Sequence, residues 1–168
     1  MKTLLLLVAF IFSSFFVQAQ MTNQRLKSIL TQEVDSIDGY SGRWQMKLKE
    51  LPMIVLTDSI NDRMRIIAPI VEASRLDEEL LLDCLTANFH SALDVKYAIS
   101  DNVLWSVYVH PLSPLSEAEV RSAVQQVFLA AATFGTSFSS TPLLFGGGNA
   151  QSQENVPAKK DSLIFKKT

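Results

Sequence analysis

The chain has 168 residues, of which 48% are hydrophobic and 19% are charged, a length that suits one ordinary domain with or without tails. The 15 Lys and Arg residues against 17 Asp and Glu residues leave a net charge of −2, without the basic excess typical of nucleic-acid-binding proteins. A single Cys excludes an intramolecular disulfide framework and any zinc or iron–sulfur site built from several cysteines. No catalytic triad, metal-ligand set or phosphate-binding loop is recognisable, so we expect no enzyme, no metal site and no cofactor.

The first 19 residues have the pattern of a secretory signal peptide. Lys2 gives a positive start, residues 4–16 are apolar except for two serines, and Val17 and Ala19 occupy the small-residue positions of a cleavage site. The alternative is an N-terminal membrane anchor, but a spanning helix needs about 20 apolar residues. We therefore expect cleavage after Ala19 and an exported protein, periplasmic or secreted, with no transmembrane segment left after cleavage.

The first half of the remaining chain predicts one helix and three strands. Residues 20–38 carry apolar side chains at spacings of three and four, which is typical of an amphipathic helix. A Gly-Tyr-Ser-Gly turn follows, and residues 43–49 then alternate between apolar and polar, as in a strand with one wet face. Residues 53–57 and 63–72 predict two further strands, with either a bulge or a locally unpaired site at Pro69.

The second half predicts a helix, a hairpin and a second helix. Ser74 and Asp77 are both candidate N-caps for the first of these helices. Two strands, residues 94–100 and 103–110, are joined by a two-residue turn. Ser116 and Glu119 predict a capping box at the start of the last helix, and Gly135 is a candidate for its C-cap.

These elements predict an α+β fold in the order α-βββ-α-ββ-α. The hairpins favour a five-stranded antiparallel sheet of order 1-2-3-5-4 packed against the helices. The domain spans residues 20–140, and residues 141–168 predict a flexible tail rich in Gly, Ser, Gln and Lys. The domain has 10 basic and 15 acidic residues (net −5), whereas the tail has 4 and 2 (net +2).

The second, third and fifth strands are apolar on both faces, which is typical of strands covered on both sides. Three helices can cover one face, so either a partner chain or another part of this chain, a helix or the tail, covers the other. The residues assigned to this partner or dimer surface are Ile67, Val71, Leu104 and Tyr108, together with Cys84 on the second helix. For Cys84, a buried small hydrophobic residue and a thiol at a dimer interface both remain open.

The element order resembles the type III secretion chaperone-like fold, and especially its YbjN-like branch. The resemblance covers residues 26–138. It is carried by the Leu-rich helix that runs from Leu81 to Asn88, the strand, turn and strand that follow it, and a Pro/Leu connector to the capped helix. The resemblance implies a small non-enzymatic dimer that holds partner polypeptides on its sheet and helix surfaces.

Together, the residues and the resemblance favour an exported, chaperone-like binding module. Its expected partner is a protein or peptide, with a homodimer as the expected assembly. The alternative is a structural or accessory protein of the cell envelope that attaches to an acidic surface through its tail. The attracting charges would be the four lysines on either side of a short apolar segment at residues 162–165, namely Lys159, Lys160, Lys166 and Lys167.

Overall fold

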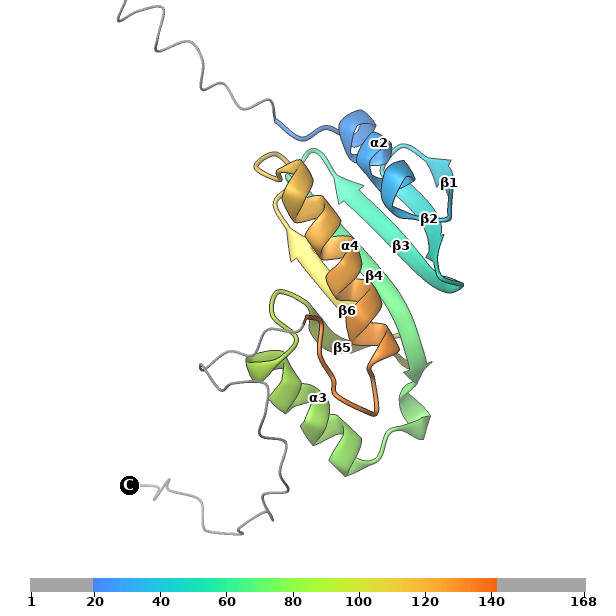
Figure 1. Ribbon diagram of the computed structural model, residues 1–168, viewed down its shortest axis with the longest axis vertical. Helices are drawn as coiled ribbons and strands as arrows, with labels where there is room; N and C mark the ends of the chain where they lie inside the picture. The colour runs from blue at the N-terminus through green and yellow to red at the C-terminus, as the bar shows by residue number, and fades with distance from the viewer. Residues whose placement is uncertain (1–19, 142–168) are drawn as a thin grey trace, which may run out of the picture.

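The computed structural model describes residues 20–141 as one sheet with helices packed against it (Figure 1). The predicted signal peptide and all but the first residue of the predicted tail lie outside the described residues. In chain order the elements are α2 (Asn23–Glu33), β1 (Ser36–Tyr40), β2 (Arg43–Leu48), β3 (Leu51–Asp58), β4 (Arg63–Glu72), the short 3-10 helix η2 (Ala73–Arg75), α3 (Glu78–His90), β5 (Lys96–Ser100), β6 (Val103–His110) and α4 (Glu117–Ala132).

The α+β class is confirmed, with a single antiparallel sheet. Its order is β1-β2-β3-β4-β6-β5, so the sheet has six strands and the predicted count of five is wrong. The five predicted strands keep their predicted relative order, and β1 is added beside β2. The predicted order placed the strands at residues 43–49 and 94–100 at the two edges. Of these, only the second, β5, is an edge strand in the structure.

The helix predicted over residues 20–38 is shorter than expected. It begins after Thr22, whose hydroxyl accepts a hydrogen bond from the Arg25 amide, and it ends at Glu33. Residues 36–40 pair with β2 instead, and Gly39 lies opposite Trp44. The apolar side chain of Ile37 fits a helical spacing and a strand alternation equally well, and strand pairing decides between them.

The hairpin between β2 and β3 is tighter than the sequence predicted. Lys49 and Glu50 form its two-residue turn with φ of 48° and 67°, and β3 begins at Leu51 rather than Met53. Pro52 is tolerated because the pairing with β4 begins only at Ile54, so no β4 carbonyl needs the N–H that proline lacks. The bulge predicted at Pro69 is confirmed by a register shift between Pro69 and Val71.

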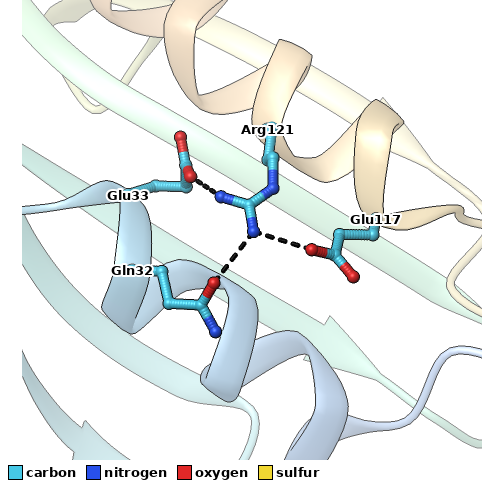
Figure 2. Close-up of polar contacts among 4 residues, drawn as sticks. All are labelled: Gln32, Glu33, Glu117 and Arg121. Atoms are coloured by element: carbon cyan, nitrogen blue, oxygen red, sulfur yellow. Dashed lines mark hydrogen bonds and ion pairs between the residues drawn. The ribbon is translucent and has the colours of Figure 1, made fainter.

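Helices α2 and α4 lie side by side on the same face of the sheet (Figure 1). The Arg121 guanidinium of α4 forms ion pairs with Glu33 and Glu117 and donates to the side-chain oxygen of Gln32 at 2.9 Å (Figure 2). It therefore links α4 to the last turn of α2. Beneath the two helices the core side chains of β2, β3 and β4 are almost completely buried.

The start of α4 agrees with the sequence pattern. The Ser116 hydroxyl accepts from the Glu119 amide at 3.2 Å, and the Glu119 carboxylate accepts from the Ser116 amide at 2.6 Å, which confirms the capping box. The predicted C-cap at Gly135 is wrong, because Thr133 occupies that position. Gly135 adopts a φ of +75° two residues later, where the chain turns away from the helix.

Gly39 tests how tightly β1 packs against β2. Its φ is +117° and a Cβ atom there would lie 2.4 Å from the Arg43 carbonyl oxygen. We expect Gly39→Ala to lower the free energy of unfolding by about 2 kcal/mol or more, because backbone strain and a clash coincide. Gly135→Ala is the matched control, since its φ is also positive but nothing lies within 4 Å of the added methyl group. It should cost about 1 kcal/mol. Equal losses for the two variants in urea titrations would contradict the close approach of β1.

Candidate binding surfaces

The two faces of the sheet have different surroundings. On one face, Ser106 donates its hydroxyl to the Val127 carbonyl at 3.0 Å and Tyr97 donates its hydroxyl to the Ala130 carbonyl at 2.7 Å. These contacts place the side chains of one register on the α4 side, which we call the core face. Alternate residues point to the opposite side, which we call the open face. Within residues 20–141, no helix covers the middle of the open face.

Most of the residues predicted for the partner surface lie away from the open face. Leu104 and Tyr108 are 1% and 5% exposed and belong to the core face, where they pack in the main cluster. Val71 pairs with Leu104 and also contacts the core, because the bulge after Pro69 shifts the register of β4. Only Ile67 lies on the open face, where it is partly exposed.

The prediction chose the wrong face of β6 for a physical reason. Both registers of this strand are apolar, so alternation alone cannot tell which one meets α4. The open face instead receives Val103, Trp105, Val107 and Val109, which are partly or largely exposed. The available signal was Ser106, a small polar residue that suits close contact with a helix better than the larger residues around it.

Cys84 is a buried small residue of α3, which agrees with the first of the two alternatives left open by the sequence. It is 4% exposed and its thiol is free. Burial, together with the nearby Asp83 carboxylate, raises the pKa of the Cys84 thiol to about 11. At neutral pH the group therefore stays protonated and is a poor nucleophile.

The open face has an apolar strip along its central strands. Neighbouring strands place Ile54 beside Ile67 and Ile67 beside Val107. The strip continues into Trp105, which is partly exposed and whose indole N–H donates to the Ser100 carbonyl at 3.1 Å. The strip is formed by Ile54, Leu56, Ile67, Trp105, Val107 and Val109.

Two arginines flank Leu56 at one end of this strip. Leu56 lies between Arg43 on β2 and Arg65 on β4, and all three belong to one cross-strand row. Both arginines are exposed, and neither forms an ion pair within the described part of the chain. Two shallow hollows adjoin this row, and Arg43 and Leu56 line both of them. The larger has a volume of about 370 Å³. Carboxylates also line the hollows, Asp38 in one and Asp58 beside Arg63 in the other. The domain carries net negative charge, whereas this part of its surface is apolar with three arginines against two carboxylates.

The outer edge of the sheet at β5 is already occupied. Asn88 of α3 accepts from the Tyr97 amide at 2.7 Å and donates to the Tyr97 carbonyl at 3.2 Å. One side-chain amide thus takes the place of a neighbouring strand, which blocks strand addition at this point. Strand addition is therefore blocked at the middle of β5.

A polar hollow of about 310 Å³ lies between the end of β6 and α4. Its carboxylates have structural roles, because Glu119 completes the capping box and Asp94 accepts from the Gln126 side chain at 3.1 Å. The hydrogen bonds from Ser116 lower the pKa of Glu119, so it is ionised near neutral pH. Burial, reinforced by Asp94, raises the pKa of Tyr108 to about 12. Neither group has a pKa suited to acid–base chemistry near pH 7.

The described residues contain neither a metal-binding cluster nor a membrane-spanning helix. No group of three or more His, Cys, Asp or Glu side chains in residues 20–141 could hold a metal ion. None of the helices in the same range is long and apolar enough to cross a membrane.

A comparison with solved structures finds a similar arrangement of helices and strands in a chain of the HopA1–SchA chaperone–effector complex. The TM-score is 0.52 at 11% sequence identity, and the match covers 65% of this chain and 88% of that chain. This chain therefore shares its fold with a chain of that complex. At this identity the similarity extends to the fold alone, so the YbjN-like branch stays a prediction. No family model and no curated protein matches the sequence.

The reactivity of Cys84 tests its buried position. At pH 8 we expect the folded protein to react with iodoacetamide at least roughly 100-fold more slowly than an ordinary thiol, because a pKa near 11 leaves little thiolate. Protein unfolded in guanidinium chloride is the control and should react at the rate of a free cysteine. Rapid labelling of the folded protein, measured by mass spectrometry, would place Cys84 at the surface instead.

Proposed function

We propose that this protein is an exported, non-enzymatic binding module that holds a partner polypeptide on the open face of its sheet. The observation that carries the proposal is the apolar strip centred on Ile67 and Val107, which no described helix covers. Apolar surface of this kind commonly marks an interaction site. The fold similarity to a chain of the HopA1–SchA chaperone–effector complex supports a polypeptide as the ligand class.

The chemistry of the open face narrows the choice of partner. Arg43 and Arg65 flank Leu56 without partners of their own in the described chain, so a segment with apolar side chains and flanking carboxylates complements them. The partner we propose is thus an acidic, amphipathic polypeptide segment. The element order and the Leu-rich helix α3 support placing the protein in the YbjN-like branch of the chaperone-like fold.

Export is the second part of the proposal and is supported by the first 19 residues of the sequence. We expect the protein recovered from cells to begin at Gln20 and to be found in the periplasm or the medium, as determined by N-terminal mass spectrometry of each fraction. Ala19→Glu should block processing, because the cleavage site needs a small residue, whereas Gln20→Glu, the control, lies after the site. A cytoplasmic protein that retains Met1 would contradict export.

The polypeptide-binding role can be tested by photo-crosslinking in living cells. With a photoreactive phenylalanine analogue at Val107, on the open face, we expect an adduct with another polypeptide. The same analogue at Thr31, exposed on α2, is the control and should give none. Adding Arg43→Glu and Arg65→Glu to the Val107 variant should reduce the adduct roughly tenfold, since two attractive charges become repulsive.

A control separates loss of charge complementarity from loss of folding. Lys27 is exposed on α2, away from the open face, so Lys27→Glu should leave the adduct unchanged. No adduct from Val107 in a folded protein would contradict polypeptide binding at the open face. An adduct that is insensitive to the arginine substitutions would keep polypeptide binding and remove the acidic character of the partner.

A further inference from the structure

Helix α3 has an apolar surface that faces away from the domain. Leu82, Leu85 and Phe89 are 56%, 65% and 77% exposed, and their spacing of three and four residues places them on one side of the helix. Leu81 lies at the border of this group and is 37% exposed. We call these four residues the α3 stripe. The stripe is separate from the apolar strip on the open face.

The contacts of α3 with the domain leave this helix weakly held. The side chains that it buries are those of Cys84 and Ala87, both small, and the larger apolar side chains of the stripe are in water. An isolated helix of 13 residues is marginally stable, and packing of an apolar face normally provides its stability. The stripe therefore needs a cover that residues 20–141 do not supply.

The end of the described chain is fixed beside α3. The Ser140 amide donates to the Ser91 carbonyl at 3.1 Å, and the Ser140 hydroxyl donates to the Ala92 carbonyl at 2.7 Å. The Ser91 hydroxyl in turn donates to the Phe138 carbonyl at 2.7 Å. Ser91 is the C-cap of α3, so the chain leaves the domain at the same end of the helix as Phe89.

The residues that follow Thr141 have the composition and length to cover the stripe. They are Pro142, then three consecutive apolar residues, Leu143, Leu144 and Phe145, and then three glycines. Four extended residues reach about 13 Å. The stripe from Phe89 back to Leu82 spans seven residues of helix, or about 10 Å. The apolar segment can therefore lie along the whole stripe and end where the glycines begin.

We propose that residues 143–145 of the same chain dock on the α3 stripe. The other plausible occupant is a second copy of the protein. Only Pro142 separates Thr141 from the apolar segment 143–145. This short linkage gives the segment a millimolar effective concentration at the stripe, which a free second copy does not reach at ordinary concentrations. The C-terminal part of the chain thus closes the second apolar surface of the domain and leaves the open face for the partner.

Hydrogen exchange of the full-length protein tests this docking. In the triple variant Leu143→Ser, Leu144→Ser, Phe145→Ser, the amides of α3 should exchange at least roughly tenfold faster, because the helix loses its cover. The matched control is the triple variant Leu163→Ser, Ile164→Ser, Phe165→Ser, which removes the same kind of side chain from the distal apolar segment. Its α3 amides should exchange as in the parent. The amides of β6 should not change in either variant, which verifies that the sheet remains folded.

Two results would overturn the proposal. One is unchanged α3 exchange in the 143–145 variant with an intact sheet. The other is a parent protein that sediments as a dimer, provided that Leu85→Ser dissociates this dimer and the 143–145 variant leaves it intact. In that case a second copy occupies the stripe. A parent that is monomeric and becomes self-associating in the 143–145 variant would support docking, because the stripe is then exposed. Neither result depends on whether the open face binds a polypeptide.

Discussion

The close packing of α4 across the centre of the sheet is the contact on which the rest of the structure depends. Ala68 on β4 lies beside Ser106 on β6, and both are completely buried. Their small side chains let the helix approach, and α4 contributes Ala123 and Ala130 on its own side. The Ser106 hydroxyl would be costly to bury alone, but the Val127 carbonyl accepts its hydrogen bond. This contact determines which side of every strand becomes the core.

The position of α4 has a direct consequence for the opposite side of the sheet. Since α2 packs beside α4, both helices lie on the core face of the sheet. The strands that are apolar on both sides therefore present Ile54, Ile67 and Val107 on the open face. Asn88 blocks the backbone edge of β5 at Tyr97, and the open face carries the apolar strip that we propose as the binding surface. The proposed polypeptide partner and the proposed docking of residues 143–145 fill two separate apolar surfaces of one small domain.

Local patterns in the sequence predicted much of the fold. The capping box of Ser116 and Glu119, the bulge at Pro69 and the N-cap at Asp77 all occur where their residue types predicted them, because each depends on contacts a few residues apart. The errors concern distant contacts. Residues 36–38 were assigned to a helix because their pairing with β2 is not visible in local spacing.

The binding surfaces show the same division. Apolar alternation identified Ile67 and the central strands as surface candidates, but Leu104 and Tyr108 were placed on the wrong side, since two apolar registers look alike until a helix covers one of them. The stripe of α3 is exposed in the structure, although Leu85 and Phe89 are as apolar as any core residue.

The sequence by itself determined the composition limits, the α+β order and the local caps and turns, which arise from short-range hydrogen bonds and side-chain periodicity. Only the tertiary structure decided the sixth strand, the face that α4 covers, and the pairing of Arg43 and Arg65 about Leu56. These features join residues that are distant in the chain. Local periodicity cannot distinguish the two apolar faces of a strand, and packing against a helix decides which face is buried.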